Sequence, residues 1–344
     1  MQRTDRKLLQ TSSIKMDAAA KAYTELRQTV ITEGILERDY LYYAMNTLFG
    51  TAGFSFSLYQ LFTTSQTPFV IFWSLILAFF SVQLSGSLHD AGHRAMFKST
   101  VWNDVAGFLY STPFGMGYSN WKWRHNMHHA HPNEEDEDPD INIPILSFSE
   151  EQIKSKKGIE RFLTRYQVYL YYILGLFVFI SFRLKSLDYF FKDFSLKKVP
   201  ELLIFTIGNI FWFTAPFFLF PFPKALLIVV VVNLSTGIYM LNIFAPNHKG
   251  MPQIKKGAKI SFLEQQILTT RNVEGNWLND FVYLGLNYQI EHHLFPNCPR
   301  SKLNLITPHV VALCKKLDLE YTRVTPLQQN QIILAELHQV SRLR

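Results

Sequence analysis

Two long stretches of the chain carry almost no charge. Residues 41–88 contain no Lys, Arg, Asp or Glu, and in residues 202–247 the only charged residue is Lys224. A helix needs about 20 apolar residues to cross the hydrocarbon core of a bilayer, and each stretch is roughly twice that length. Each stretch therefore predicts a hairpin of two membrane-spanning helices.

A short break divides each stretch. In the first stretch the break is residues 63–68, which are mostly polar and uncharged, and in the second it is the Pro-Phe-Pro-Lys sequence at 221–224. We therefore predict an all-α integral membrane fold, capped by a cytoplasmic helical domain. Its four transmembrane helices, in two hairpins, are expected at about residues 41–62, 68–88, 201–221 and 225–246.

A third uncharged run is shorter. Residues 166–182 form a run of 17 residues between Arg165 and Arg183, which is at the lower limit for a membrane span. A single crossing here would put the histidine-rich segments before and after it on opposite sides of the membrane. We therefore predict a helix that lies at the membrane interface or is partly inserted.

Composition and charge agree with a multi-pass membrane protein. Of the 344 residues only 18% are charged and 48% are hydrophobic, with 30 Phe and 16 Tyr. Almost every Lys and Arg lies in residues 1–40, 89–200 and 248–344, so the positive-inside rule assigns these segments, with both termini, to the cytoplasmic side. The net charge of +7 then reflects topology and anionic lipid headgroups rather than nucleic acid.

The N-terminal segment differs from the rest. Residues 1–40 mix acidic and basic residues before any apolar run, which excludes a secretory signal peptide. Residues 8–36 could form an amphipathic helix at the membrane interface or a solvated helix. We expect residues 41–344 to form a single membrane domain. The only two cysteines, Cys298 and Cys314, exclude a disulfide framework and an iron–sulfur cluster held by thiolates.

Seven of the 11 histidines fall in three short segments, which we call the first, second and third histidine boxes: HDAGH at 89–93, HNMHH at 125–129 and QIEHH at 289–293. In a helix, residues three and four apart share a face. This spacing puts His89 with His93, and His125 with His128 and His129; Gln289, His292 and His293 repeat the second pattern. Three such clusters on one side of a membrane predict a metal site rather than isolated interfacial histidines.

The number of histidines favours two metal ions. Imidazole ligands suit zinc, copper and iron alike, but a zinc site needs only three or four of them. If the chemistry uses dioxygen, a dinuclear iron site is the expected choice. The paired Glu-x-x-His motif of soluble di-iron proteins is absent, and we expect the nearest carboxylate, Glu291, to face away from its histidine neighbours.

The chain resembles the membrane fatty acid desaturase superfamily, whose boxes have the patterns HxxxH, HxxHH and HxxHH or QxxHH. The third box, in NYQIEHHLFP at 287–296, is similar to that of the front-end desaturases, in which Gln replaces the first histidine. The resemblance extends from about Ser85 to Tyr321. It includes HHAHPN at 128–133, DPDINI at 138–143 and NVEGNWLND at 272–280.

The resemblance implies a di-iron centre with O2 as co-substrate. The implied ligands are His89, His93, His125, His128, His129, His292 and His293, with His248 of NHKGMP as an eighth. It implies that Gln289 approaches the second metal directly or through water. His131 matches no ligand of the family, and we expect it to lie beside the metal ligands or to have only a structural role. Asp90 would orient His89 or cap the loop. Trp121, Trp123 and Tyr288 would line an acyl tunnel or serve only in packing.

The implied activity is O2-dependent formation of a cis double bond in a fatty acyl chain, of the front-end type, on acyl-CoA or acyl-lipid. A hydroxylase or ketolase with the same metal centre, acting on alkyl or carotenoid substrates, and a zinc-dependent membrane lipid hydrolase are the alternatives. The sequence contains no His-Pro-Gly-Gly haem motif, so we expect a separate ferredoxin or cytochrome b5 as electron donor. The basic segments 154–165 and 249–259 would bind that donor or lipid.

Overall fold

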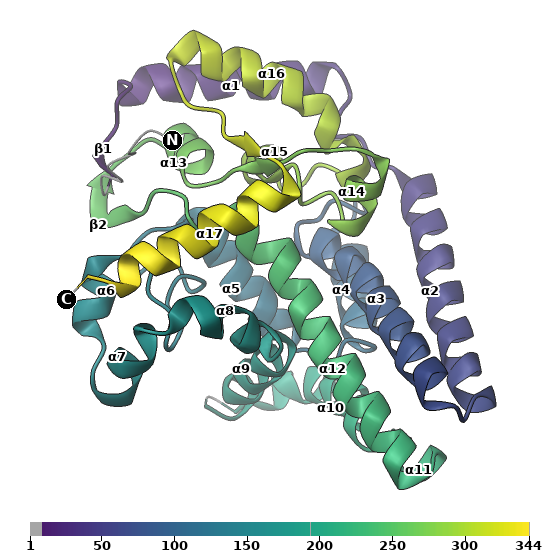
Figure 1. The fold of residues 1–344 in the computed structure, drawn as a ribbon. Coiled ribbons are helices and arrows are strands. Elements are labelled where there is room, and N and C mark those ends of the chain that lie inside the picture. Colours follow the sequence, from purple (N-terminus) through teal and green to yellow (C-terminus); the bar gives the residue numbers. More distant parts are fainter. Residues whose placement is uncertain (1–8, 193, 344) are drawn as a thin grey trace. The chain divides into compact units, whose positions relative to one another are not determined.

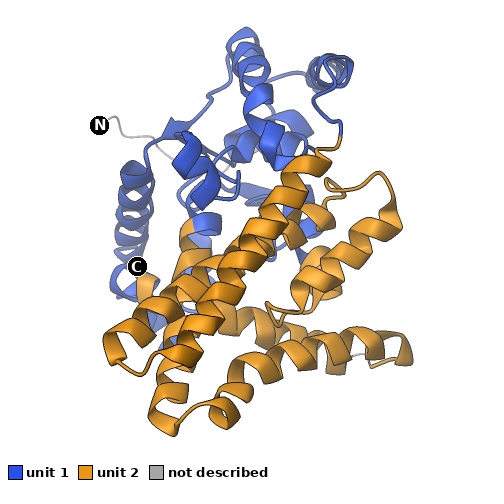
Figure 2. Ribbon diagram, turned by 90° about the vertical axis from the view of Figure 1, so that its right-hand side faces the viewer, with its two compact units in different colours: residues 1–37, 124–171, 243–344 blue, residues 38–123, 172–242 orange. Residues whose placement is uncertain are grey.

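The computed structural model describes residues 9–192 and 194–343. This part of the chain is mostly α-helical, with two short parallel two-stranded sheets, β1–β2 and β3–β4 (Figure 1). It forms two compact units that interleave along the sequence (Figure 2). Unit 1 comprises residues up to 37, 124–171 and 243 onward, and unit 2 comprises residues 38–123 and 172–242.

Unit 1 contains the four strands and many short helices. Its strands are β1 (Leu9–Thr11), β2 (Ile254–Lys259), β3 (Asn272–Val273) and β4 (Arg323–Val324). Its helices are α1 (Met16–Thr32), α6 (Glu150–Ser155), α7 (Gly158–Thr164), α13 (Phe262–Leu268), α14 (Trp277–Val282), α15 (Gln289–Leu294), α16 (Leu303–Leu317) and α17 (Pro326–Ser341), with 3-10 turns η2 (Ala245–Asn247) and η3 (Arg300–Lys302).

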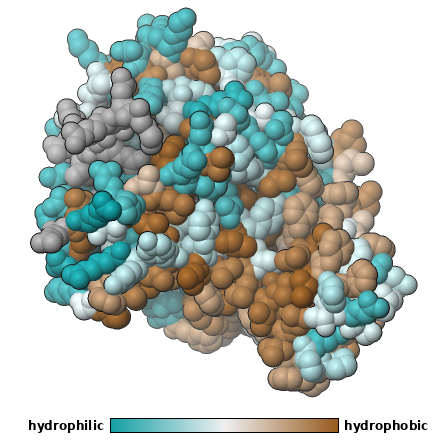
Figure 3. Space-filling view, in the orientation of Figure 1, coloured by the Kyte–Doolittle hydropathy of each residue, from teal (hydrophilic) through white to brown (hydrophobic). Residues whose placement is uncertain are grey.

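Unit 2 contains the longer apolar helices. They are α2 (Tyr40–Thr63), α3 (Thr67–Gly92), α4 (Thr100–Ser111), α9 (Val178–Lys192), α10 (Val199–Phe213) and α11 (Ala215–Leu219), with the 3-10 turn η1 (Leu196–Lys198). Three further helices run through a boundary between the units: α5 (Tyr118–Ala130), α8 (Gln167–Gly175) and α12 (Phe222–Phe244). In Figure 3 much of the visible surface over α3 and α12 is hydrophobic.

Two helices among the described residues are long and apolar enough to cross a membrane, by length and composition. They are residues 67–92 and 222–247, which match two of the four predicted spans. The pair α8 and α9 would count as a third span, but it is bent by 72° at its break. The structure therefore supports two or three candidate spans, and the count of four stays a prediction.

The other two predicted spans form helices of a different kind. Residues 41–62 lie in the single helix α2, whose N-terminus is capped by the Asp39 carboxylate, which accepts a hydrogen bond from Tyr42 N. Although α2 carries no charged residue, it is not among the helices that are apolar enough to count as a candidate span. Residues 201–221 are divided into α10 and α11 at Thr214, because Pro216 has no N–H to continue the helical ladder.

The α2–α3 hairpin packs closely at two glycines. A Cβ atom on Gly50 would lie 2.8 Å from Leu84 Cδ2, and a Cβ atom on Gly53 would lie 2.3 Å from Phe80 Cζ. Both distances are shorter than van der Waals contact. Glycine at these two positions therefore permits the close approach of α3, the helix that ends in the first histidine box.

The turn between α4 and α5 is held by side chains of α9 and α10. Ser186 Oγ accepts a hydrogen bond from Gly117 N at 3.0 Å, and the Glu201 carboxylate accepts one from Ser119 N at 2.7 Å. The Trp212 indole N–H donates to the Pro113 carbonyl at 2.5 Å. These bonds satisfy backbone groups that would otherwise be buried without partners, and they determine where α5, the helix of the second histidine box, begins.

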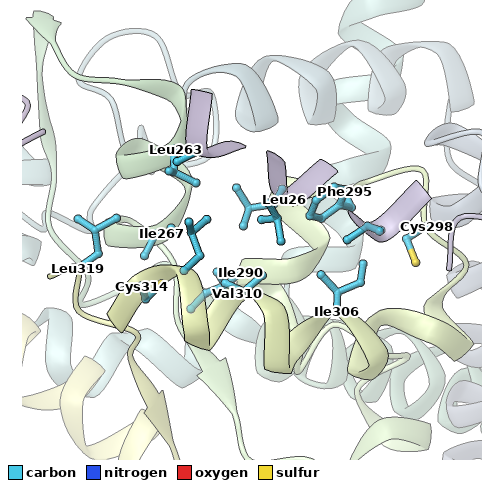
Figure 4. Packing of buried hydrophobic residues seen from close by; sticks show 14 of the residues in the cluster. Leu26, Leu263, Ile267, Ile290, Phe295, Cys298, Ile306, Val310, Cys314 and Leu319 are labelled. Atoms are coloured by element: carbon cyan, nitrogen blue, oxygen red, sulfur yellow. The ribbon is translucent and has the colours of Figure 1, made fainter. Parts of the chain in front are cut away.

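The N-terminal helix α1 packs against protein in unit 1. Its buried residues Ala19, Ala22, Leu26 and Val30 recur at three- and four-residue spacing, as expected for one face of a helix. That face joins a core with α13, α15 and α16 (Figure 4). The N-terminal helix is predicted from the sequence to lie at the membrane interface or in solvent. In the structure its apolar face instead packs against the helix that carries the third histidine box.

This core makes a testable prediction about stability. Ile306 on α16 is fully buried in the core, whereas its neighbour Leu305 is 51% exposed. We expect Ile306→Ala to lower the stability of the fold by roughly 2–5 kcal/mol, because it leaves a cavity, and Leu305→Ala to have little effect. Thermal unfolding of the purified protein in detergent measures the difference, and equal midpoints for the two variants would contradict this packing.

Candidate metal centre

Histidines of the second and third boxes meet a histidine from after α12 in unit 1. His128 Nε2 lies 3.2 Å from His248 Nε2, and the His293 ring lies 4.7 Å from the His248 ring, centroid to centroid. All three side chains are buried, and each offers a ring nitrogen within 4.8 Å of the others. We call His128, His248 and His293 the buried triad.

A second set of imidazoles in unit 1 is partly exposed at two of its members. His129 Nε2 lies 3.2 Å from His125 Nε2 and 3.1 Å from His292 Nε2. His125 and His129 occupy one face of α5, four residues apart, while His292 comes from α15. Alternation along both helices therefore separates the box histidines into two neighbouring groups, because adjacent residues point in different directions from a helix axis.

The first box lies in unit 2, at the end of α3. The His89 and His93 rings are 4.7 Å apart, and Asp90 Oδ1 lies 3.2 Å from His89 Nδ1. Tyr43 on α2 donates a hydrogen bond to Asp90 Oδ2 at 2.9 Å. The Trp121 ring, also in unit 2, lies 5.9 Å from the His89 ring.

Asp138 holds His128 in one orientation. Its oxygens lie 3.0 and 3.1 Å from His128 Nδ1 and also accept hydrogen bonds from the backbone N–H groups of Asn133 and Asp140, both at 2.8 Å. A carboxylate can only accept here, so Nδ1 carries the proton and Nε2 presents its lone pair to the triad. This arrangement is a common one around histidines that bind metals.

Gln266 on α13 holds His293 in one orientation with an uncharged amide group. Its side-chain N–H donates to the His129 carbonyl at 3.1 Å, which leaves Oε1 to accept from His293 Nδ1 at 2.8 Å. The His293 proton therefore lies on Nδ1, and its Nε2 is available as a ligand atom. Gln266 is fully buried, so this pair is rigidly placed.

The pKa values of His128 and His248 shift in opposite directions. Burial lowers the pKa of His128, but attraction and hydrogen bonding from Asp138 outweigh burial, so the net shift is upward. Burial holds the pKa of His248 well below its usual value, and the nearby charges of His128 and Lys249 lower it further. His248 is therefore neutral at physiological pH, which is the state that binds a metal.

The donor set fits a transition-metal ion. Nitrogen ligands at about 2.0–2.1 Å from one metal lie about 2.8–3.4 Å apart when they are neighbours in an octahedral or tetrahedral site. The separation of 3.2 Å between His128 Nε2 and His248 Nε2 falls in that range. Two buried imidazole lone pairs facing each other at this distance need a shared proton or a cation between them.

Gln289 faces the triad with its amide nitrogen. Its Oε1 accepts a hydrogen bond from Asn247 Nδ2 at 3.1 Å, and its Nε2 lies 3.0 Å from His248 Nε2. The Asn247 amide is oriented in turn, because the same Nδ2 donates to the Leu286 carbonyl at 2.9 Å. In this arrangement Gln289 presents a donor, not a metal-binding oxygen, to the cluster.

Glu291 points away from the histidines, as predicted. Its carboxylate accepts hydrogen bonds from Asn272 Nδ2 at 2.6 Å and from Tyr321 Oη at 2.7 Å. Asn272 Oδ1 also accepts from Ile290 N at 2.9 Å. This buried network fixes α15 from the side opposite to the triad, so Glu291 has a structural place in the third box.

Other residues singled out from the sequence lie elsewhere. His131 Nδ1 lies 2.9 Å from Glu134 Oε2 and is partly exposed. Tyr288 donates to the Asp280 carboxylate at 3.2 Å, and Trp123 is 62% exposed. The predicted roles of Tyr288 and Trp123 in lining an acyl tunnel stay predictions.

Sequence reasoning missed Asp138, Gln266 and Asn272. Asp138 opens the DPDINI segment and follows His128 by ten residues, so an acidic residue close behind a histidine box was the available signal. Gln266 lies 27 residues before His293, and no local pattern marks it. Both contacts join residues from different elements, so spacing alone does not reveal them.

Comparison with known proteins identifies the family. The family profile described as "Fatty acid desaturase" matches residues 65–325, which is most of the chain and includes all three boxes. The chain is 31% identical over 338 residues to the "Acyl-lipid (9-3)-desaturase" of Physcomitrium patens, covering 93% of this chain and 63% of that protein.

Two further relatives carry similar names. The "Delta(8)-fatty-acid desaturase" of Euglena gracilis is 28% identical, over 95% of this chain and 80% of its own length. "Fatty acid desaturase 3" of Homo sapiens is 32% identical, over 72% of this chain and 56% of its own length. The chain spans less than two thirds of the Physcomitrium and human proteins. Because the family profile covers well over half of the sequence, this chain belongs to the fatty acid desaturase family.

Proposed function

We propose that this protein is an O2-dependent desaturase that introduces a cis double bond into the acyl chain of an acyl-CoA or acyl-lipid, with front-end regioselectivity. The observation that carries the proposal is the buried triad, in which oriented imidazoles from separate parts of the chain converge. The names of relatives, which include Delta(8), Delta(6) and Delta(5) desaturases, support the front-end assignment.

We propose that two iron ions are held by eight histidines: His89, His93, His125, His128, His129, His248, His292 and His293. When bound, such a centre supplies the activation of dioxygen needed to remove hydrogen from an unactivated methylene. Gln289 would act through water or through His248 rather than as a direct ligand, since its amide nitrogen faces the cluster.

The protein's own part is to orient ligands and exclude water. Asp138, Gln266 and Asp90 would each keep the proton of one histidine on the nitrogen that faces away from the metal. Trp121, Trp123 and Tyr288 would line the acyl path, and burial around the triad would limit solvent access during the reaction. Electrons would come from a small carrier protein of the cytochrome b5 or ferredoxin class.

For the membrane topology we propose four transmembrane helices in two hairpins, with the histidine boxes and both termini on the cytoplasmic side. The long uncharged helix α2 and the uncharged run from residue 202, which forms most of α10 and all of α11, support this count. The sharp bend between α8 and α9 supports an interfacial or partly inserted position for residues 166–182.

The activity prediction uses two histidines. His248→Ala should abolish the new double bond, because it removes a ligand from the buried triad. His309→Ala should leave it intact, because His309, on α16, is partly exposed and pairs with Glu33 after α1. Gas chromatography of fatty acids from a host expressing each variant, fed defined unsaturated acids, measures the product.

The fatty acid product and the metal content distinguish a desaturase from the alternative enzymes. An oxygenated chain without a new double bond would identify a hydroxylase or ketolase. One zinc and no iron in active protein would identify a hydrolase. Full desaturation by His248→Ala would contradict the ligand assignment.

The metal prediction concerns Asp138. Asp138→Asn keeps the side-chain size but removes the charge that orients His128, so we expect metal affinity to fall about 10–100-fold. Asp136→Asn is the matched control, because Asp136 is exposed at its side chain and lies two residues away. Iron per chain in the purified protein, measured by inductively coupled plasma mass spectrometry, is the readout; equal iron in both variants would argue against this role.

The topology prediction uses single introduced cysteines, since both native cysteines are buried. A membrane-impermeant maleimide should label Thr64→Cys from the side opposite to Lys154→Cys, because a four-span chain puts the α2–α3 turn across the membrane from the boxes. Lys154→Cys and Lys185→Cys should label from the same side. Opposite labelling of Lys154→Cys and Lys185→Cys would instead make α8 and α9 a true span.

A further inference from the structure

An apolar stripe runs along α7 and the beginning of α8 in unit 1. Ile159, Phe162, Tyr166 and Tyr169 follow one another at spacings of three and four residues, and they are 67%, 49%, 48% and 77% exposed. The Phe162 and Tyr166 rings are in contact, with centroids 5.5 Å apart, so they share a face. Exposed side chains of this size at helical spacing indicate a face that binds an apolar partner.

A cavity lined by arginines lies beside the same helix. It has a volume of about 620 Å³, and its charged lining residues are Arg161, Arg165 and Arg342. Its other lining residues are Ile153, Thr164, Ser341 and Leu343, so none of the described residues that line it carries a carboxylate. All of these residues belong to unit 1.

The three guanidinium groups have no anionic partner within the part of the chain that the structure describes. On the neighbouring helix α6, Glu150 pairs with Lys154 at 2.7 Å. Three cations around one cavity repel one another unless an anion lies among them. The cavity therefore has the charge of an anion-binding site.

The chemistry of the site suits an oxyanion such as phosphate. A guanidinium group presents N–H donors in a planar fork that matches two oxygens of one phosphate. Arg161 and Arg165 alternate in sequence with Phe162 and Tyr166, so α7 and the turn that follows it carry both the cationic groups and most of the apolar stripe. Helices of this kind lie in the membrane interface, with aromatic rings at the acyl boundary and arginines reaching the headgroups.

We propose that this face is a binding site for an anionic membrane phospholipid. Its phosphate would lie among Arg161, Arg165 and Arg342, and its acyl chains would contact the stripe of Ile159, Phe162, Tyr166 and Tyr169. A free anion would use the arginines alone and leave the stripe exposed. The negative surface of the cytoplasmic leaflet complements the charge of the cavity. The site requires only that the protein lies at a membrane, and it is independent of the proposed desaturase activity.

The test measures lipid affinity of the full-length protein in detergent. Dioctanoyl phosphatidic acid is titrated by microscale thermophoresis against the wild-type chain and against the combined variant Arg161→Gln, Arg165→Gln, Arg342→Gln. Loss of the charge-assisted hydrogen bonds should weaken binding by about tenfold or more. The variant Arg161→Lys, Arg165→Lys, Arg342→Lys, which keeps the charge without the planar fork, should lie between the two.

The matched control removes the same number of charges elsewhere on unit 1. Lys21 on α1 and Lys315 and Lys316 on α16 are exposed, and their replacement by Gln should leave the affinity near the wild-type value. Thermal unfolding checks that every variant is folded. Dioctanoyl phosphatidylcholine, which carries no net charge, should bind more weakly than phosphatidic acid.

Three outcomes would overturn the proposal. The first is unchanged affinity in the glutamine variant, and the second is an equal loss in the lysine control, which would indicate bulk charge. The third is displacement of the lipid by inorganic phosphate at similar concentrations, which would indicate a free-anion site. Loss of binding after Phe162→Ser with Tyr169→Ser, with the arginines intact, would support the lipid.

Discussion

The close approach of buried imidazole nitrogens is the constraint on which the rest of this structure depends. His128 and His248 face each other at 3.2 Å, in surroundings that burial makes poor in water. Such a pair is stable only if a shared proton or a cation lies between the two nitrogens, and a metal cation can bind there only if each ring keeps its proton on the nitrogen that faces away. Asp138 and Gln266 meet this requirement for His128 and His293, one with a full charge and the other with an oriented amide.

The surrounding helices hold these rings in place. The third box is a helix of only six residues, α15 (Gln289–Leu294), which is far too short to be stable alone. It is held on one side by the core that includes α1 and α16, and on the other by the hydrogen-bond network of Glu291, Asn272 and Tyr321. Because this short helix has a fixed direction, His292 and His293 can belong to two different groups of histidines.

In unit 2, glycines and a few polar contacts fix the positions of the helices. Its helices are apolar, so burial alone does not specify their register, and directional contacts take that role. Glycines in α2 let α3 approach, and polar side chains of α9 and α10 hold the backbone of the turn before α5. Satisfying backbone groups inside an apolar environment is worth several kcal/mol each, which makes these few polar contacts decisive for where the second box begins.

The sequence by itself determined the features that are local or periodic. Uncharged runs marked α3 and α12, the spacing of the boxes predicted histidines sharing a helix face, and the position of Glu291 between Gln289 and His292 indicated that it points away. Tertiary structure alone decided that His248 contacts His128 across 120 residues, that Asp138 and Gln266 orient two of the rings, and that α1 covers the third box rather than lipid. These contacts join side chains far apart in the chain and have no period. They depend on how the helices pack, and packing is invisible to any pattern read along one segment.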